Sequence, residues 1–499
     1  MTLKNAKMFC YYVIHCDNVN ATSELLTFDT PILLPPLFGF TIQGILIAFK
    51  IFFESIVSFL VINICLDEGI FMLFKLTTRL TLVMFALFLG NSVLADGHGK
   101  IKIGILHSLS GTMAISETTL KDTMLMLIDE QNKKGGILGK KLEPVVVDPA
   151  SNWPLFAEKA RELLTVSKVD VMFGCWTSVS RKSALPVLEE LNGLLFYPVQ
   201  YEGEESSKNV FYTGAAPNQQ AIPATDYYLE ELGVKKFALL GTDYVYPRTT
   251  NKILKQYLID KGIPESDIFV NYTPFGHSDW SKIVADVVGL GADGKKVGVI
   301  STINGDANIG FYKELAAAGI KADDIPVVAF SVGEEELSGL DTKNLVGHLA
   351  AWNYFQSAES DLNTDFIKQW KSTMGDKRVT NDPMEAHVIG FKMYVKAVEK
   401  AGKTDVDAVR KAMYGMKVPN LTGGMAEMLP NHHLSKPVLI GEIQADGQFD
   451  IISQTKEVPG DAWTDYLAES KPLVSDWKSL GCGMYNKDTK TCVQMKSNY

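Results

Sequence analysis

The sequence lacks the motifs by which common enzyme classes are recognised. The segment GKK at residues 139–141 is not a phosphate-binding loop, because the preceding glycine spacing and the following Ser or Thr are missing. No GxSxG nucleophile motif occurs. Cys175 invites comparison with amidases that use a cysteine nucleophile, but those enzymes also need a Lys and a Glu in a recognisable motif. We therefore expect neither enzymatic activity nor a cofactor.

Metal-ligand clusters and an excess of basic charge are also missing. The chain has 8 His residues, and the pair His432 and His433 has no third ligand at metal spacing, so we interpret it as part of a loop. The net charge of -10 argues against a nucleic-acid partner. Charged residues make up 21% of the chain and hydrophobic residues 46%, a globular composition with enough apolar residues for more than one core.

The first hundred residues differ from the rest. A short basic segment, a short apolar run and a small residue at Ala95 predict a signal peptide over residues 72–95. A signal peptide begins near an initiating Met, and Met72 is in place, so we interpret residues 1–71 as an upstream extension of the reading frame. The alternative is that the apolar stretch 42–66 is a membrane anchor.

Few cysteines follow the predicted cleavage site. They are Cys175, Cys482 and Cys492. The last two flank a polar, turn-rich loop, and in an oxidising periplasm they can pair and hold the C-terminal tail, residues 457–499. Cys175 would then be a packed, unreactive thiol.

From residue 100 onward, apolar strand-like runs alternate with helical segments of ten or more residues. This rhythm predicts βαβ units and parallel sheets. It runs through residues 100–216 and restarts over 217–350. We predict an α/β fold with two doubly wound parallel-sheet lobes, in which residues 355–420 return to lobe 1 and 430–456 to lobe 2. Ligands of such sheets bind outside the carboxyl ends of the strands, so a hinged cleft between the lobes is the expected site.

Aromatic, hydroxyl and amide side chains follow two predicted strands of lobe 1. They are Trp176, Thr177 and Ser178 after one strand, and Tyr197 and Gln200 after the next. Aromatic rings provide flat walls, and hydroxyls and amides provide hydrogen bonds, so the pattern indicates a pocket for a small polar molecule. The alternative interpretation of Trp176 and Tyr197 is that they are core aromatics.

Three short segments carry a resemblance to a known family. They are GCWTS at 174–178, FYPVQYEG at 196–203 and GTDYVYPR at 241–248. From Lys100 to Lys456 the chain resembles the substrate-binding proteins of bacterial ABC transporters with the Leu/Ile/Val-binding, type I fold, and within them the urea and short-chain amide branch. The resemblance implies a monomeric periplasmic receptor that closes around urea by hinge bending and delivers it to membrane permease subunits.

The resemblance also implies roles for particular residues. Tyr197 matches a position that faces the amide, and Tyr244 and Tyr246 match a pair that closes the cleft from lobe 2. Spaced by two, these tyrosines would point the same way in an extended segment. Urea offers one carbonyl oxygen and two amino groups, so a dry pocket must supply more acceptors than donors.

Several further polar residues follow predicted strands of lobe 2. Asn304 and Asp306 could accept hydrogen bonds from urea, and Ser331 and Glu334 are weaker candidates. The alternative role of Asp306 is a helix N-cap.

The charged residues near the lobe 1 candidates are expected to be solvated. We interpret Glu202, Glu204 and Glu205 as a solvated loop, and expect Arg181 and Lys182 to face water or a carboxylate. Alternative functions are a general short-amide receptor, a branched-chain amino-acid receptor, which needs a paired cation and anion, and a cytoplasmic amide sensor, against which the signal peptide argues.

Overall fold

The computed structural model describes residues 9–11, 24–26 and 99–493. The chain forms two compact units, Met1–Gly97 and His98–Tyr499. In the first unit, strands β1 (Phe9–Tyr11) and β2 (Glu24–Leu26) pair antiparallel. The predicted signal peptide at 72–95 and most of the predicted upstream extension at 1–71 lie outside the described residues and stay predictions.

Lobe 1 of the second unit is built on a five-stranded parallel sheet in the order β4-β3-β5-β6-β7. The strands are β3 (Ile101–Leu106), β4 (Leu142–Val147), β5 (Val171–Gly174), β6 (Leu195–Tyr197) and β7 (Val210–Tyr212). Four of them match the predicted strands, whereas β7 follows β6 without a helix between them, so the alternation of strands and helices does not indicate it. The inner strands read as continuous apolar runs because helices cover both faces of the sheet.

Six helices belong to lobe 1. They are α3 (Ala114–Lys133), α4 (Trp153–Glu162), α5 (Ser178–Glu190), α11 (Asp361–Met374), α12 (Asp382–Ala401) and α13 (Val406–Met413). α3 packs against α12, and α4 packs against α5. The crossovers that contain α3 and α4 run in opposite directions along the sheet, so right-handed connections place these two helices on opposite faces.

Lobe 2 contains a seven-stranded sheet in the order β17-β16-β12-β11-β10-β8-β9. The strands are β8 (Lys236–Thr242), β9 (Ile268–Thr273), β10 (Val297–Thr302), β11 (Val327–Ala329), β12 (Leu349–Trp352), β16 (Leu439–Ile443) and β17 (Phe449–Gln454). β8 to β12 pair in parallel, and β16 and β17 add an antiparallel edge. The expected α/β fold with parallel sheets is confirmed, with a mixed edge in lobe 2.

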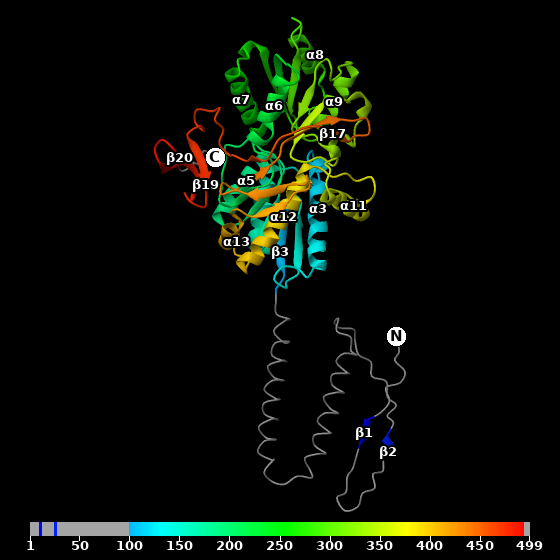
Figure 1. The fold of residues 1–499 in the computed structure, drawn as a ribbon, viewed down its shortest axis with the longest axis vertical. Helices are drawn as coiled ribbons and strands as arrows, with labels where there is room; N and C mark the ends of the chain where they lie inside the picture. Colours follow the sequence, from blue (N-terminus) through cyan, green and yellow to red (C-terminus); the bar gives the residue numbers. More distant parts are fainter. Residues whose placement is uncertain (1–8, 12–23, 27–98, 494–499) are drawn as a thin grey trace, which may run out of the picture. The chain divides into compact units, whose positions relative to one another are not determined.

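Helices cover both faces of the lobe 2 sheet, and two separate cores result. The helices are α6 (Ala221–Glu230), α7 (Val245–Asp260), α8 (Ser281–Leu290), α9 (Ala307–Ala317) and the short α10 (Glu334–Leu337). Short helical turns are η2 (Leu163–Ser167), η3 (Pro217–Gln219), η4 (Glu265–Asp267) and η5 (Thr342–Asn344). Figure 1 shows the helices of lobe 2, in green, at one end of this unit, and α3, α12 and α13 of lobe 1 at the other.

The chain crosses between the lobes four times, after Tyr212, Trp352, Lys436 and Gln454, and the side chains of Asn353 and Gln219 connect the crossings. Asn353 follows β12, and its Nδ2 donates to the carbonyl oxygens of Gln219, at 3.2 Å, and Pro437, at 2.7 Å. The carboxamide of Gln219 in turn donates to the carbonyl oxygen of Leu434 at 2.8 Å. Each crossing is therefore held by hydrogen bonds to the others, which defines the hinge.

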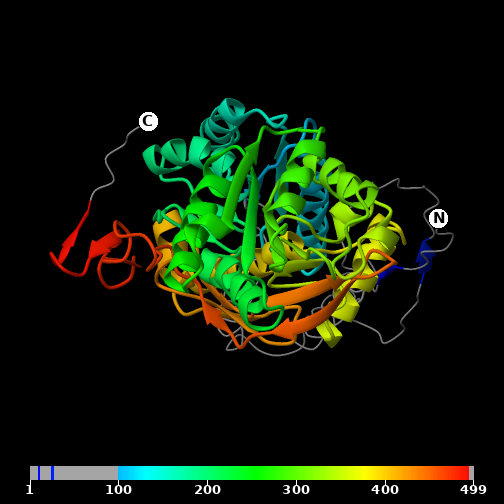
Figure 2. The same ribbon diagram turned by 90° about the horizontal axis from the view of Figure 1, so that it is seen from above.

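Two small sheets complete the second unit. Beside lobe 1 lies a four-stranded sheet of β13 (Lys417–Pro419), β14 (Met425–Met428), β15 (Leu434–Lys436) and β18 (Val458–Pro459). The C-terminal tail forms a three-stranded sheet of β19 (Leu473–Asp476), β20 (Cys482–Asn486) and β21 (Thr491–Cys492). The tail, in red in Figures 1 and 2, lies at one side of the unit.

The structure pairs Cys482 with Cys492, whose Cα atoms are 6.2 Å apart. Cys175 is free and fully buried. The tail has only a small apolar core, made by Ala462, Trp463 and Leu473. A small core of this kind relies on covalent support.

Replacing both cysteines by serine, Cys482→Ser with Cys492→Ser, should loosen the tail and leave the lobes intact. Closing a short loop is worth about 3 kcal/mol in the chain-entropy account. We expect amide hydrogen exchange to speed up within 473–493 while β3, β5 and β10 keep their protection. Equal loss of protection in the lobe sheets would show that the tail is part of one cooperative core instead.

Candidate ligand-binding cleft between the lobes

Each lobe sheet has a point at which the strand order reverses, and ligands bind outside the carboxyl ends of strands at such points. This switch point lies between β3 and β5 in lobe 1 and between β8 and β10 in lobe 2. Trp176 and Thr177 follow β5, Tyr244 follows β8, and Asn304 follows β10. The topology therefore brings predicted site residues of both lobes to the switch points.

The lobes are in direct contact along this line. The Gln200 Nε2 of lobe 1 donates to the Ser331 Oγ of lobe 2 at 2.7 Å. A second cross-lobe hydrogen bond runs from the Ser116 Oγ to the Glu336 Oε1 at 2.6 Å. The cleft is closed in this structure.

A glycine allows the lobes to approach at the β10 switch loop. Gly305 has a φ of +67°, and a Cβ added there would lie 2.8 Å from the carbonyl oxygen of Thr112 in lobe 1. A side chain at this position would combine a strained backbone with a steric clash. The close approach of the lobe 2 loop at Gly305 to Thr112 of lobe 1 thus depends on the absence of a side chain at Gly305.

Gln200 is the most informative residue in the cleft. Gln200 is 3% exposed, and its Nε2 donates a hydrogen bond to the Ser331 Oγ. Its Oε1 is buried and has no hydrogen-bond partner among the described residues, and the same holds for the Tyr246 hydroxyl. Burial raises the pKa of Tyr246, so the phenol is neutral. The cleft thus contains an unused acceptor beside a group that can donate or accept.

Tyr244 and Tyr246 do not lie on an extended segment. α7 begins at Val245, so Tyr244 is the N-cap residue and Tyr246 lies in the first turn. Tyr246 is buried, whereas Tyr244 is partly exposed. Their ring centroids are 6.1 Å apart. The two rings are neighbours because both residues lie at the start of α7, and not because they alternate along a strand.

The lobe 1 candidates are all buried, and several of their polar atoms are already engaged. Thr177 caps α5, since its Oγ1 accepts from the backbone N–H of Ser180 at 3.2 Å. The Tyr197 hydroxyl donates to the carbonyl oxygen of Trp176, and the Ser178 hydroxyl donates to Glu202. The Trp176 Nε1 is buried without a partner among the described residues.

The two remaining lobe 2 candidates differ from each other. Asn304 is buried, and its Nδ2 donates to the carbonyl oxygen of Thr302 at 3.0 Å. Asp306 is exposed and occupies the N-cap position of α9 without a side-chain capping bond. Asn304 therefore belongs to the enclosed part of the cleft, and Asp306 lies outside it.

The expectation of a solvated acidic loop is wrong. Glu202 and Glu205 are each 1% exposed, and Arg181 is fully buried. The Arg181 Nε lies 2.7 Å from the Glu205 Oε1, and the Lys182 Nζ lies 2.7 Å from the Glu205 Oε2. Both cations also lie 3.6 Å from the Glu202 Oε1. Glu204, the third member, is half-buried against the C-terminal tail.

Aromatic rings enclose this charge cluster. The Arg181 guanidinium lies 4.5 Å from the Tyr197 ring centroid and 4.8 Å from that of Tyr201. Burial opposes ionisation of Glu205, but the positive charges of Arg181 and Lys182 outweigh it and hold the pKa of that carboxyl well below its usual value. Two cations and two carboxylates give a wall with no net charge behind the candidate site.

His432 and His433 lie in the loop between β14 and β15, as expected, and both are fully buried. His433 stacks on Tyr212 with ring centroids 4.8 Å apart, and its Nε2 lies 2.5 Å from the Tyr201 hydroxyl. Burial lowers the pKa of both histidines. Within 99–493 and the two short N-terminal strands, His, Cys, Asp and Glu form no group of three suited to a metal ion. Among the described helices, none combines the length and apolarity needed to cross a bilayer.

A second cluster of charged residues contains carboxyl groups of both lobes, at the start of α10 and at the start of α12. Glu334 and Glu336 are buried, and Asp382 at the start of α12 is buried beside them. Burial raises the pKa of Glu334 to about 8 and that of Asp382 to about 6, with a further contribution from neighbouring carboxylates. Burial also raises the pKa of Glu336, whose Oε1 accepts the cross-lobe bond from Ser116.

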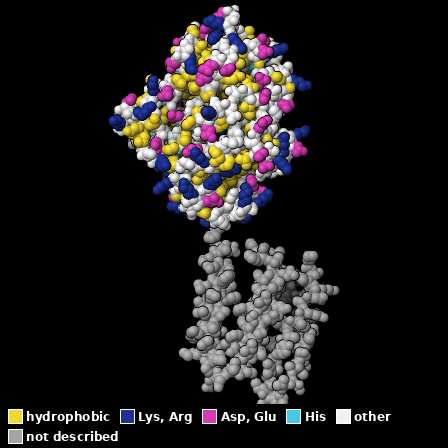
Figure 3. Space-filling model, viewed as in Figure 1, with side chains coloured by type: hydrophobic (Ala, Val, Ile, Leu, Met, Phe, Trp, Pro, Cys, Tyr) yellow, Lys and Arg dark blue, Asp and Glu magenta, His cyan; other side chains and the backbone are white. Residues whose placement is uncertain are grey.

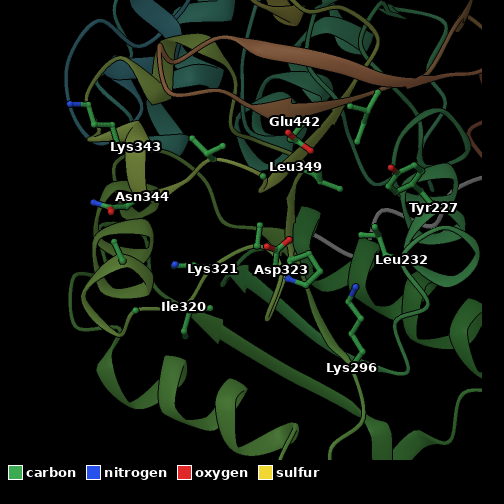
Figure 4. A pocket seen from close by; sticks show the side chains of 17 residues that line it. Tyr227, Leu232, Lys296, Ile320, Lys321, Asp323, Lys343, Asn344, Leu349 and Glu442 are labelled. Atoms are coloured by element: carbon green, nitrogen blue, oxygen red, sulfur yellow. The ribbon is translucent and has the colours of Figure 1, made fainter.

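A separate hollow of about 630 Å³ lies elsewhere in lobe 2. Its rim carries Lys296, Lys321, Asp323 and Glu442, as Figure 4 shows. Lys296, Pro326 and Leu349 stand where β10, β11 and β12 begin, so the hollow faces the amino ends of these strands. Ligands of open α/β sheets bind at the opposite ends. The cleft between the lobes is therefore the candidate ligand site.

Comparison with protein families agrees with this geometry. A family model described as periplasmic binding protein domain matches residues 101–469. The chain belongs to the periplasmic binding protein family. It is thus a binding protein, and the prediction that it is not an enzyme is confirmed. A limonene hydroxylase of Geobacillus stearothermophilus is 29% identical, but over only 28% of this chain and 26% of its own length.

Curated relatives cover most of the second unit. The Leu/Ile/Val-binding protein homolog 3 of Brucella melitensis biotype 1 is 25% identical over 72% of this chain and 94% of its own length. The Leu/Ile/Val-binding protein BraC3 of Rhizobium johnstonii is 26% identical over 65% of this chain and 87% of its own length.

Solved structures show the same fold. An ABC-transporter solute-binding protein of Rhodopseudomonas palustris in complex with benzoate has a TM-score of 0.63 at 19% identity and covers 73% of this chain and 99% of its own. A leucine-binding protein of Thermotoga maritima has a TM-score of 0.59 at 16% identity and covers 71% of this chain and 99% of its own. At these identities the likeness shows the fold alone.

Replacing Arg181 by Met should strongly destabilise lobe 1. Removing one partner of a buried ion pair leaves an uncompensated charge and costs about 3–5 kcal/mol. Adding Glu205→Gln removes that charge, so the double variant should recover much of the loss. The midpoint of chemical unfolding in guanidinium chloride measures both effects. Additive losses in the double variant would contradict the pairing.

The carboxyl cluster makes stability depend on pH. The pKa of Glu334 is raised in the folded state to about 8, so its favourable contribution is complete below about pH 4 and is lost as pH rises toward 8. Glu334→Gln keeps the acceptor for the Gln356 N–H, 2.6 Å away in the native protein, and removes the ionisation. Its melting temperature should exceed that of the native protein at pH 8.5 and match it at pH 5. An equal difference at both pH values would show that Glu334 does not titrate in this range.

Proposed function

We propose that the protein captures urea in the periplasm and delivers it to the permease subunits of an ABC-type uptake transporter. It would act as a monomer that closes around its ligand. Short-chain amides are the first alternative ligands, and branched-chain amino acids the second. Three observations support this proposal. They are the family of the chain, the chemistry of the cleft, and the sequence segments that resemble those of urea-binding proteins.

The unused acceptor of Gln200 is the observation that carries the proposal. A buried polar atom without a partner costs about 1–3 kcal/mol, so a ligand that supplies an N–H to the Gln200 Oε1 regains that free energy. Urea and primary amides carry such N–H groups. Their carbonyl oxygen would suit the donors still free in the cleft, the Trp176 Nε1 and the Tyr246 hydroxyl.

The charge balance around the cleft favours a neutral ligand. A carboxylate ligand needs a cation that has no other partner. Arg181 and Lys182, the buried or half-buried cations nearest the lobe 1 candidates, are both paired with Glu205. Binding a carboxylate there would require breaking one of these pairs.

The names of the relatives favour a different ligand class. The curated relatives named above are Leu/Ile/Val-binding proteins, and one of the solved structures holds benzoate. A branched-chain amino acid is therefore the candidate to test beside urea. It carries one positive and one negative group, and the cleft would have to supply a partner for each.

Isothermal titration of the purified protein with urea, acetamide, leucine and benzoate tests these alternatives. We expect heat on addition of urea, weaker binding of acetamide, and none with leucine or benzoate. A methyl group in place of an amino group also removes donors, so the difference between urea and acetamide should exceed the roughly 10–200-fold effect of a methyl alone. Binding of leucine without binding of urea would overturn the proposal.

Gln200→Leu should weaken urea binding roughly 10- to 100-fold, because it removes the acceptor while keeping similar volume. Gln256→Leu is the matched control, since Gln256 is exposed on α7 and bonds only Asp260 in the same helix. Both variants should melt close to the native protein. Equal urea affinity in the two variants would show that Gln200 does not contact the ligand.

A further inference from the structure

The C-terminal tail contacts both lobes, and this feature is independent of the ligand. The tail segment 461–477, here called the strap, follows β18 and precedes most of the disulfide-linked hairpin. Figure 1 shows the tail level with the boundary between lobe 1 and lobe 2. The family match ends at residue 469, inside the strap, so the hairpin lies beyond it.

The strap is anchored firmly to lobe 1 through the loop that follows β6. The Glu204 N–H donates to the carbonyl oxygen of Ala462 at 2.6 Å, and the Glu204 carboxylate accepts from the backbone N–H of Thr464 and the hydroxyl of Ser470. The Trp477 Nε1 donates to the Ser206 Oγ at 3.0 Å. The same loop carries Glu202 and Glu205 of the buried charge cluster.

The middle of the strap reaches lobe 2. The Tyr466 ring packs edge-on against the Tyr257 ring of α7, with centroids 4.7 Å apart. The Glu469 Oε1 lies 2.6 Å from the Lys252 Nζ, one turn earlier on the same helix. α7 is the helix whose first turn carries Tyr246 in the cleft.

These contacts connect two bodies that move relative to each other in a hinged protein. Opening the cleft would carry α7 away from lobe 1 and, with it, away from a strap fixed to lobe 1. The contacts of Tyr466 and Glu469 with α7 then exist only while the lobes are together. Any interaction present in the closed state alone shifts the equilibrium toward closure.

We propose that the strap is a latch that stabilises the closed state through Tyr466 and Glu469. It adds to the closing contacts inside the cleft and acts before any ligand is bound. A protein with this latch binds its ligand more tightly, because less of the binding free energy is spent on closing the lobes. The hairpin disulfide keeps the strap in place.

The test combines Tyr466→Ala with Glu469→Gln in the full protein. Small-angle X-ray scattering without ligand should give a larger radius of gyration for this double variant than for the native protein. Glu265→Gln is the matched control, because Glu265 pairs with Lys255 of the same helix inside lobe 2. It should scatter like the native protein. Equal radii for the latch variant and the native protein would overturn the proposal.

Affinity and rescue give a second readout. Exposed ion pairs and aromatic contacts are each modest, so we expect roughly 5- to 30-fold weaker urea binding by the latch variant, with an unchanged melting temperature. Exchanging the charges, Lys252→Glu with Glu469→Lys, should restore the native affinity, whereas Glu469→Lys alone should not. An affinity unaffected by the latch variant would contradict the latch.

The ligand-free scattering result also separates this proposal from the assignment of the ligand. If urea does not bind the native protein but the latch variant scatters as a more open molecule, the latch stands and the ligand assignment fails. If urea binds the native protein but the latch variant scatters like the native protein, the ligand assignment stands and the latch fails.

Discussion

A polar atom shut away from water must find a partner, and this constraint organises the cleft around Gln200. The side chain spans the two lobes through Ser331, so its own position depends on closure. Its remaining acceptor has no partner among the described residues and would suit a ligand with an N–H or O–H group. In the proposed function, closing and binding are linked through this one carboxamide, and the hydrogen bonds of Asn353 define the hinge between the lobes.

The buried ions behind the cleft act as a rigid support and not as a binding site. Arg181 lies between tyrosine rings and is paired with Glu205, which leaves the wall neutral and its positions fixed. Such a pair is costly to break and gives little net stability by itself. The ion pair fixes the loop that carries Gln200 and Glu202 next to β6. The strap contacts the same loop from the outside through Glu204. The face shown in Figure 3 mixes charges of both signs, in contrast to the ordered pairing inside.

The alternation of strands and helices predicted most of the fold because apolar runs and helical periodicity are local signals. It missed β7, because no helix separates β7 from β6, and it did not show that α7 begins at Val245. The solvated loop at Glu202 and Glu205 was the main error. Burial of a carboxylate depends on a cation brought near by the fold, and the nearby pair Arg181 and Lys182 was the one available signal. Gln200, Tyr246 and Asn304 are buried, whereas Asp306 is exposed, and position after a strand alone could not separate them.

A high-resolution crystal structure of the protein grown with urea tests the central claim most directly. The account predicts a planar ligand enclosed between the lobes, with an amino group within hydrogen-bonding distance of the Gln200 Oε1 and the Gln200–Ser331 contact retained. A closed cleft that holds a charged solute paired with Arg181 or Lys182, or urea bound away from Gln200, would contradict it.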